Sequence, residues 1–503
     1  MTAPMQPTPT SLAALLRGLV ELPEGGPEVT GLALDSREVR PGDLFFALTG
    51  SATDGRRFVD DALARGARAV VEEALVAAVA ERAGVPIVGV PDLQRRVGLV
   101  ADRFFGHPSA DLWVAGVTGT NGKTTVSHLI AQALTTHGAP LGGEPCGVLG
   151  TLGYGVFGEL HPGRHTTPDA ITVHRLLADF RGRGVRHVAM EVSSHALDQG
   201  RVSGVAFDVA IFTNLTRDHL DYHRDLTTYR QAKLRLFELQ GLGAAVVNLD
   251  DPFSASILGR LAPGAESLGY SLRDEPRARV RARSLEIGPQ GVRMEVVTPV
   301  GEGVLASPLL GRFNAGNLLA ALGALVTLPV PLPRLLEGLG QARPVAGRME
   351  RHGGQGGQPL VVIDYAHTPD ALQSVLATLR EQTRGRLTCV FGCGGERDRG
   401  KRPEMGAVAE RLADEVIVTD DNPRREDGAV IVADILAGMA WPDRARVQRD
   451  RERAIALALA EAGSEDVVLV AGKGHEDYQE VNGVRRPYSD QAVVGVLLAE
   501  RRS

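Results

Sequence analysis

The chain has 503 residues, a length that predicts two to four domains. It is 43% hydrophobic and 23% charged, as globular proteins usually are, and this composition excludes wholesale disorder. Its net charge of −6 argues against a general nucleic-acid binder. No apolar run is long enough to span a membrane, and the first ten residues lack the charged and apolar segments of a leader. We therefore expect a cytoplasmic protein that does not insert into membranes.

Lysine is rare in this chain. Four of the 55 basic residues are lysine, and the rest are arginine. Because either residue serves at most exposed positions, the few lysines are candidates for chemistry that needs a compact ammonium or a reactive amine; chance survival is the alternative. They are Lys123, Lys233, Lys401 and Lys473, and each lies in or just beyond a polar cluster that follows an expected strand.

Short, continuous apolar runs recur along the chain, each followed by a polar or Gly-rich turn. Continuous rather than alternating runs are typical of parallel strands that are covered on both faces. We expect strands at Leu112–Val117, His187–Val192, Val205–Phe212, Ala244–Asn248, Leu360–Ile363, Leu387–Phe391, Glu415–Thr419 and Asp466–Val470, and helices at Thr125–Thr135, Thr228–Phe237 and Pro369–Leu379. The pattern predicts an α/β protein, with a small antiparallel segment between residues 273 and 304.

The first polar cluster follows an expected strand and begins an expected helix, which is the context of a phosphate loop. It consists of Gly119, Thr120, Asn121, Gly122, Lys123, Thr124 and Thr125. There, backbone N–H groups hold phosphate oxygens, Lys123 reaches the β- and γ-phosphates, and the Thr124 hydroxyl can hold Mg²⁺. The first glycine of the common pattern would fall at Val117, so the loop departs from that pattern. We predict a nucleotide phosphate site; the alternative is a turn that binds nothing.

Two more clusters follow the next expected strands. Glu191 lies near a strand end and is a candidate Mg²⁺ ligand, or else a surface carboxylate ahead of a serine-capped helix. Asp218 and His219 begin a segment of two aspartates and two histidines. Lys233 lies ten residues beyond that segment, and its chemistry leaves a salt bridge and a functional amine both open.

The C-terminal third contains similar strand-end clusters. Asp364 could contact a ribose or a metal-bound water, and Pro369 fits a helix start. The loops around Lys401 and Lys473 indicate anion handling near a nucleotide or substrate, or else they are solvated loops.

Together and in this order, these motifs resemble the Mur ligase family, most closely its MurE type, the UDP-N-acetylmuramoyl-tripeptide synthetases. The resemblance covers nearly the whole chain. Its other motifs include Asp35-Ser-Arg, Thr166-Thr-Pro-Asp169, Gly311-Arg-Phe-Asn-Ala-Gly-Asn317, Gly347-Arg-Met-Glu350, Asp421-Asn-Pro-Arg424 and Gly472-Lys-Gly-His-Glu476.

The resemblance implies an N-terminal domain for the UDP-muramoyl substrate, a central P-loop ATPase and a C-terminal Rossmann-like domain for an amino acid. A linker at Phe105–Asp111 and a break near Gly340–Val345 place these domains at 1–110, 111–343 and 344–503. The implied partners are UDP-N-acetylmuramoyl-L-alanyl-D-glutamate and a free diamino acid, without nucleic acid, and the chain is expected to be a monomer.

The resemblance also implies residue roles. Substrate contacts fall to Ser36, Thr166, Thr167, Ser193 and Arg201, and adenosine-side contacts fall to Asn317, Arg348 and Asp364. Lys233 would carry a carbamate from CO₂ (N6-carboxylysine) and, with His219, would serve a second Mg²⁺ beside the one expected at Thr124 and Glu191. Lys123, Lys233 and His219 would be the catalytic groups. The amino-acid pocket would consist of Arg397, Asp421, Asn422, Pro423, Arg424, Gly472 and Glu476.

The implied reaction is ATP-dependent amide formation in peptidoglycan precursor synthesis, through an acyl phosphate of D-glutamate. An arginine at position 424 favours meso-diaminopimelate, because a guanidinium pairs bidentately with its second carboxylate. L-Ornithine or L-lysine stays open, since Arg424 could instead hold the α-carboxylate or pair with Asp421 or Glu426. Two different functions also stay open. A ligase like folylpolyglutamate synthetase would not need the 35–37 and 421–424 motifs, and a P-loop switch or binding module would not need the third domain.

Overall fold

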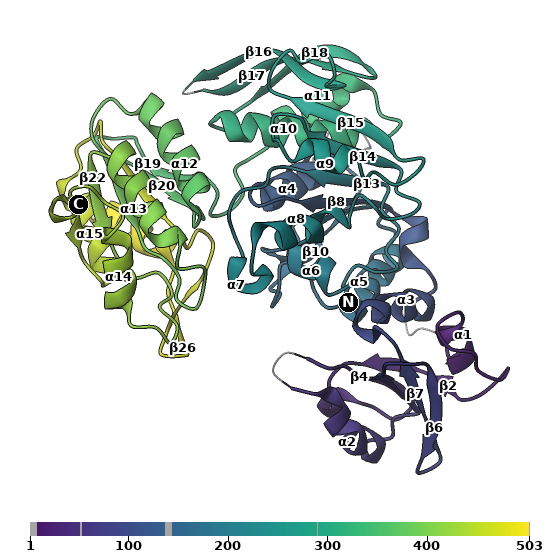
Figure 1. Cartoon of the computed structure of the whole chain (residues 1–503). Coiled ribbons are helices and arrows are strands. Elements are labelled where there is room, and N and C mark those ends of the chain that lie inside the picture. Colours follow the sequence, from purple (N-terminus) through teal and green to yellow (C-terminus); the bar gives the residue numbers. More distant parts are fainter. Residues whose placement is uncertain (1–7, 51–52, 136–142, 289, 502–503) are drawn as a thin grey trace.

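The structure is a computed structural model that describes residues 8–50, 53–135, 143–288 and 290–501. Most of the first ten residues considered above therefore lie outside the described residues. In the described residues, the main sheets have five, eleven and six strands and follow one another along the chain (Figure 1). The α/β class predicted from the sequence is confirmed.

The N-terminal sheet has the strand order β3-β4-β5-β7-β6, with β6 antiparallel at its edge. Helices α1 and α3 cover one face, and α2 covers the other. Helix α3 also packs on α5 of the middle unit, so it joins the two units. The elements are β1 Thr10–Ser11, α1 Leu12–Leu16, β2 Glu28–Val29, β3 Gly31–Ala33, β4 Asp43–Ala47, α2 Val59–Ala64, β5 Ala69–Glu73, β6 Ala78–Arg82, β7 Val85–Val90 and α3 Leu93–Phe104.

The middle sheet has the order β11-β10-β9-β12-β8-β13-β14-β15-β16-β17-β18, parallel from β9 to β16 and antiparallel at both ends. Helices α4, α10 and α11 cover one face, and α5, α6, α8 and α9 cover the other. The strands are β8 Trp113–Thr118, β9 Cys146–Gly150, β10 Gly153–Val156, β11 Glu159–His161, β12 His187–Glu191, β13 Val209–Phe212, β14 Ala244–Asn248, β15 Glu266–Ser271, β16 Val280–Gly288, β17 Gly291–Thr298 and β18 Gly301–Ser307. The helices are α4 Lys123–Thr135, α5 Ala170–Gly182, α6 Ser194–Asp198, α7 Leu220–His223, α8 Leu226–Leu234, α9 Ser254–Leu258, α10 Arg312–Leu325 and α11 Leu332–Gly340.

The C-terminal sheet has the order β19-β20-β24-β21-β22-β23 and is parallel except at β19. Helices α12, α13 and α14 cover one face, and α15 and α16 cover the other. The elements are β19 Glu350–Gly353, β20 Leu360–Asp364, α12 Pro369–Gln382, β21 Leu387–Phe391, α13 Lys401–Leu412, β22 Glu415–Val418, α14 Gly428–Leu436, β23 Arg446–Val447, α15 Arg451–Glu461, β24 Val467–Ala471, the hairpin β25 Tyr478–Val481 and β26 Val484–Pro487, and α16 Asp490–Glu500.

The parallel pairing of the middle sheet positions the site. Strand β8 lies between β12 and β13 and runs parallel to both. The segments that follow these three strands therefore meet at one edge, where ligands bind in such sheets. Those segments begin at residues 119, 192 and 213.

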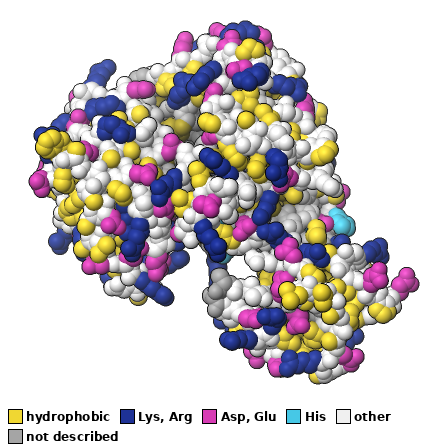
Figure 2. Space-filling view, in the orientation of Figure 1, with side chains coloured by type: hydrophobic (Ala, Val, Ile, Leu, Met, Phe, Trp, Pro, Cys, Tyr) yellow, Lys and Arg dark blue, Asp and Glu magenta, His cyan; other side chains and the backbone are white. Residues whose placement is uncertain are grey.

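The surface in Figure 2 carries Lys and Arg side chains interspersed with Asp and Glu, rather than gathered by sign. This distribution agrees with the small net charge of −6. None of the helices in the described part of the chain is both long and apolar enough to cross a membrane.

Candidate active site

The loop between β8 and α4 is shaped by two glycines. Gly119 and Gly122 have φ values of +152° and +87°, which side-chain-bearing residues rarely adopt. A Cβ at Gly119 would lie 1.9 Å from Thr213 Oγ1, and one at Gly122 would lie 2.6 Å from Asn317 Oδ1. Glycine is therefore required at both positions for the loop to fit against its neighbours at the start of α4.

Glu191 is fully buried at the end of β12, and hydroxyl groups surround it. Thr124 Oγ1 donates to Glu191 Oε2 at 3.0 Å, and the Thr151 hydroxyl donates to the same oxygen at 3.1 Å. The Thr151 N–H donates to Glu191 Oε1 at 2.7 Å. The two predicted Mg²⁺ ligands Thr124 and Glu191 thus lie within contact of each other, and both carry oxygen donors, which Mg²⁺ prefers.

Two lysine amines meet at one backbone oxygen. Lys123 Nζ donates to the Gly119 carbonyl at 2.9 Å, and Lys233 Nζ donates to the same oxygen at 2.8 Å. Burial and the neighbouring Lys123 lower the pKa of Lys233 well below its usual value, against the opposing effect of Asp218. The geometry therefore favours a neutral amine at Lys233.

His219 and Asp218 lie beside these amines, after β13. Asp218 Oδ2 is 3.4 Å from His219 Nε2 and 3.8 Å from Nε2 of His367, a residue of the C-terminal unit. Burial lowers the pKa of His219 to about 3, so its imidazole is neutral near pH 7. A neutral imidazole is the form that binds metal ions. In the described residues, no three His, Cys, Asp or Glu side chains form a ready-made metal cage.

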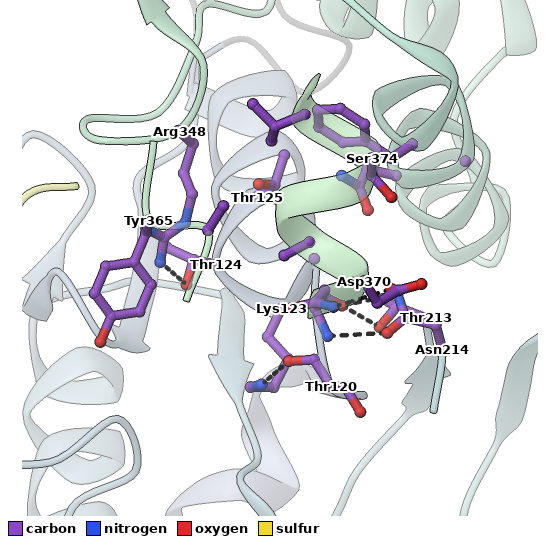
Figure 3. Close-up of a pocket in the computed structure, with 18 of the residues that line it drawn as sticks. Thr120, Lys123, Thr124, Thr125, Thr213, Asn214, Arg348, Tyr365, Asp370 and Ser374 are labelled. Atoms are coloured by element: carbon purple, nitrogen blue, oxygen red, sulfur yellow. Dashed lines mark hydrogen bonds between the residues drawn. The ribbon is translucent and has the colours of Figure 1, made fainter. Parts of the chain in front are cut away.

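The C-terminal unit supplies one wall of the cavity (Figure 3). Arg348 Nη2 lies 3.4 Å from Thr124 Oγ1, and its guanidinium stacks on the Tyr365 ring, 4.4 Å from the centroid. Asp364 accepts the Met349 N–H at 2.8 Å, and burial raises the pKa of Asp364. Asn317, on α10, donates to Asn314 at 3.1 Å.

The cavity has a volume of about 750 Å³ and is lined by both units. Many of the predicted site residues share it. They are Thr120, Asn121, Gly122, Lys123, Thr124, Thr125, Thr166, Glu191, Ser193, His219, Lys233, Asn317, Arg348 and Asp364.

The residues predicted to contact the muramoyl substrate fall into two places. Thr167 Oγ1 accepts the Ser193 N–H at 3.0 Å, and Arg201 Nη1 donates to the Thr167 carbonyl at 2.9 Å. Thr166 Oγ1 lies 3.1 Å from Oγ1 of Thr151, which itself binds Glu191. Thr166, Thr167, Ser193 and Arg201 therefore form one cluster beside Glu191. Ser36 is buried in the N-terminal unit after β3, apart from that cluster.

The predicted amino-acid residues form a separate network on the C-terminal sheet. Asn422 Nδ2 donates to Glu476 Oε2 at 2.7 Å. Lys473, with no exposed side-chain surface, donates to Glu476 Oε2 at 3.0 Å and to Asn422 Oδ1 at 3.1 Å. Gly472 has a φ of +111°, and a Cβ there would lie 2.5 Å from Asp421 Oδ2. The Glu476 carboxylate is therefore paired with the ammonium of Lys473.

Arg424 has no acidic partner in the described part of the chain. Its Nη1 donates to the Gly395 carbonyl at 2.7 Å, and its N–H donates to the Glu480 carbonyl at 2.9 Å. Glu426 instead binds Arg399 and Arg402, each at 3.0 Å. The alternative that Arg424 pairs with Asp421 or Glu426 is therefore wrong. Arg397 donates to the Glu396 carbonyl at 3.0 Å, and Pro423 precedes Arg424 in the same loop.

Several residues of the site had no role assigned from the sequence, although Thr213, Asn214 and Tyr365 lie within its strand-end clusters. Thr151 follows β9, an apolar run that the expected strands did not include, and the same strand-end rule would have found it. Thr213 and Asn214 follow β13; Thr213 donates to the Asn121 carbonyl at 2.5 Å, and Asn214 accepts the Asn121 N–H at 2.9 Å. Tyr365 follows Asp364 directly, but a tyrosine has no sequence signature for stacking on Arg348.

A phosphate loop, a buried carboxylate beside it and a cavity completed by a third unit define an ATP-using enzyme that works between domains. Models of known families match the chain in three segments: "Mur ligase family, catalytic domain" at residues 28–105, "Mur ligase middle domain" at 117–325 and "Mur ligase, glutamate ligase domain" at 347–474.

Individual relatives agree with these matches. The UDP-N-acetylmuramoyl-L-alanyl-D-glutamate–2,6-diaminopimelate ligase of Pseudomonas aeruginosa is 54% identical over 91% of this chain and 93% of its own. The ligase of the same name from Ectopseudomonas mendocina is 53% identical over 96% of this chain and 98% of its own. A solved structure of that name is 37% identical, with a TM-score of 0.71, and covers 99% of this chain and 100% of its own.

The chain belongs to the Mur ligase family. Its three-domain architecture and its class, an ATP-dependent amide-forming ligase, are as predicted from the sequence.

Proposed function

We propose that the chain joins meso-diaminopimelate to UDP-N-acetylmuramoyl-L-alanyl-D-glutamate, with ATP cleavage, in peptidoglycan precursor synthesis. One observation supports the choice of amino acid. The Arg424 guanidinium binds a backbone carbonyl but no carboxylate of the described residues. It is available for the far carboxylate of diaminopimelate, which lysine and ornithine lack. The names of the two relatives and of the solved structure support the same substrate.

The loop at 119–125 binds the ATP phosphates, with Lys123 offsetting the charge of the transferred phosphoryl group. Asn317, Arg348 and Asp364 contact the adenosine side. The D-glutamate carboxylate attacks the γ-phosphorus to give an acyl phosphate and ADP. The amine of the diamino acid then attacks the acyl carbon, a C–N bond forms, and phosphate leaves.

Lys233 is proposed to carry a carbamate. A neutral amine adds to CO₂ and releases a proton, and the lowered pKa of Lys233 supplies that neutral amine. Thr124 and Glu191 would hold one Mg²⁺ through oxygen atoms, and His219 and the carbamate of Lys233 would hold a second. When bound, Mg²⁺ supplies positive charge next to the phosphoryl oxygens.

The cluster of Thr166, Thr167, Ser193 and Arg201 is proposed to bind the muramoyl-dipeptide beside the phosphate site, and Ser36 to bind its uridine end. The amino-acid pocket comprises Arg397, Asp421, Asn422, Pro423, Arg424, Gly472 and Glu476. We propose domain limits of 1–110, 111–343 and 344–503 and a monomer. Because both nucleotide substrates are cytoplasmic metabolites, we place the reaction in the cytoplasm.

Phosphate release tests this function. We expect release only when ATP, UDP-N-acetylmuramoyl-L-alanyl-D-glutamate and a diamino acid are all present. Specificity constants measured side by side should favour meso-diaminopimelate over L-lysine and L-ornithine. A preference for lysine or ornithine would contradict the proposed amino-acid substrate, but the assignment of the chain as a ligase would stand. Turnover with a folate substrate, or release with ATP alone, would support the folylpolyglutamate-type ligase or the P-loop switch.

A further inference from the structure

Arg217 crosses from the middle unit to the C-terminal unit. It lies in the loop after β13, directly before Asp218 and His219. Its Nε donates to Asp398 Oδ2 at 2.9 Å and its Nη2 to Asp398 Oδ1 at 3.1 Å. Asp398 follows Arg397 in the loop that precedes α13. One side chain thus joins the phosphate edge of the middle sheet to the loop that carries a proposed amino-acid contact.

Asp398 is held in place by burial and by a second hydrogen bond. The Asp398 side chain is only 8% exposed, and its Oδ1 also accepts the Gly400 N–H at 2.9 Å. Burial alone would raise the pKa of Asp398, but the hydrogen bonds from Arg217 and Gly400 outweigh it and hold the pKa below its usual value. A bidentate guanidinium–carboxylate pair fixes orientation as well as distance. Arg217 Nη1 adds an outer contact to Glu404 Oε1 at 3.2 Å, on the first turn of α13.

Gly400 leaves the space that the Arg217 guanidinium occupies. A Cβ at Gly400 would lie 2.0 Å from Arg217 Nη2. The backbone does not require glycine there, because its φ of −63° suits any residue. An alanine at position 400 would therefore displace the end of the Arg217 guanidinium from its place beside Asp398.

The loop also continues into the amino-acid pocket. The Gly395 N–H donates to the Asn422 carbonyl at 2.9 Å, and the Gly395 carbonyl accepts Arg424 Nη1 at 2.7 Å. By contrast, the pair of His367 with Asp218, which also joins the two units near this edge, is 3.8 Å long. Arg217 therefore makes the closer charged connection between the phosphate edge and the pocket.

We propose that Arg217 is a positioning residue that acts through Asp398 to hold the 394–400 loop against the phosphate edge. The diamino acid bound by this loop and the 421–424 loop then meets the acyl phosphate. This inference rests on the proposed function for its substrates. Arg217 is needed for amide formation, whereas the first step, attack of the D-glutamate carboxylate on ATP, uses groups that Arg217 does not touch.

The test compares the two chemical steps in variants of the full chain. Acyl phosphate is trapped by borohydride reduction without a diamino acid, and amide formation is measured against diaminopimelate concentration. We expect Arg217→Ala and Gly400→Ala each to lower kcat/KM for diaminopimelate about tenfold, equivalent to about 1.4 kcal/mol. Acyl-phosphate formation should change less than about twofold. Glu404→Gln, which loses only the outer contact, is the matched control and should resemble the wild type.

The double variant Arg217→Asp with Asp398→Arg exchanges the two charges. It should recover part of the lost kcat/KM for diaminopimelate, and this recovery would not occur if each residue acted independently of the other. Small-angle scattering without substrates gives a second readout: the radius of gyration should rise in Arg217→Ala and Gly400→Ala and fall back in the exchanged pair. Unchanged kcat/KM and radius in both single variants, or equal loss of both chemical steps, would overturn the proposal. If the wild type ligates no diamino acid, the proposed function fails, and the scattering result alone decides on Arg217.

Discussion

Lys233 and Lys123 share the carbonyl oxygen of Gly119, and two ammonium groups that close together repel each other. The buried position of Lys233 adds the cost of taking a charge out of water. Burial and the neighbouring Lys123 both lower the pKa of Lys233, against the opposing effect of Asp218, and so favour the neutral amine. An arginine could not respond in this way, because its guanidinium stays protonated in proteins. This chain uses arginine for most of its positive charge, and the proposed carbamate would give the lysine at position 233 a chemical reason.

We expect Lys233→Ala to abolish ligation, because the variant cannot form a carbamate. A short carboxylic acid should restore part of the activity by supplying the missing carboxylate. Lys233→Arg should also be inactive, because a guanidinium is not expected to form that carbamate. The ligation rate of each variant, measured at increasing acetate concentration, tests both the loss and the recovery. Near-normal turnover of the Ala variant would show that no carbamate is needed.

Lys473 is expected to act on amino-acid binding through Glu476 and Asn422. Lys473→Met removes the cation from the largely buried Glu476 carboxylate, and such a loss is costly because the remaining charge then depends on the neutral Asn422 amide. The KM for diaminopimelate should rise about tenfold or more, the size expected for a lost charged hydrogen bond. The KM values for ATP and for the UDP-linked substrate serve as internal controls. A similar rise in all three would indicate a general loss of packing instead.

Most secondary structure that surrounds the site could be predicted from the apolar runs. The runs at 112–117, 187–192 and 244–248 correspond to β8, β12 and β14, and the alternation between 273 and 304 corresponds to the antiparallel strands β16 and β17 and the start of β18. Strand β9 was missed because Gly147 and Gly150 interrupt its apolar run. Glycine fits there because a Cβ at Gly147 would lie 2.7 Å from the Phe180 ring, a contact set by a helix far along the chain.

The site was predictable where a motif carries its own chemistry. The 119–125 loop follows β8 and Glu191 ends β12, and the parallel order brings those strand ends together. Arg217 was not predictable, because its partner Asp398 lies 181 residues away in another unit. The same holds for the contact of Lys473 with Asn422, which depends on how two loops of the C-terminal sheet meet.

Helices α15 and α16 are joined by a fully buried ion pair. Arg451 Nε and Nη2 donate to the Asp490 carboxylate at 2.8 Å each, and Nη2 also donates to the Ala471 carbonyl at the end of β24. Asp490→Ala leaves the guanidinium buried and unpaired, so we expect the free energy of unfolding to fall by about 3–5 kcal/mol.

Urea unfolding of the full chain measures this loss. Glu337→Ala, which breaks the exposed pair with Arg334, is the control and should cost no more than about 1 kcal/mol. Equal effects of the two substitutions would mean that the buried pair contributes no more than a surface pair.

In the proposed function, the three units divide the substrates among them, and the reaction takes place in the cavity lined by the middle and C-terminal units. The N-terminal unit contacts the middle unit through α3 and α5, away from the phosphate loop (Figure 1). Binding of the UDP-linked substrate and binding of ATP should therefore be separable. The affinity for each of these two substrates would depend on its own set of residues, although turnover needs both substrates.

Lys123→Ala tests this division. The variant lacks the ammonium that faces the phosphates, so we expect acyl-phosphate formation to fall by about a thousandfold or more, as when a charged stabiliser of phosphoryl transfer is removed. The affinity for the UDP-linked substrate, measured by calorimetry without ATP, should stay within about threefold of the wild type, because its proposed contacts lie at Ser36 and in the cluster at 166–201. The same measurement with Arg201→Ala should give the opposite result, with weaker binding of the UDP-linked substrate and little change in ATP affinity. Equal loss of both affinities in Lys123→Ala would mean that the two sites are not independent and that the division of substrates between the units is wrong.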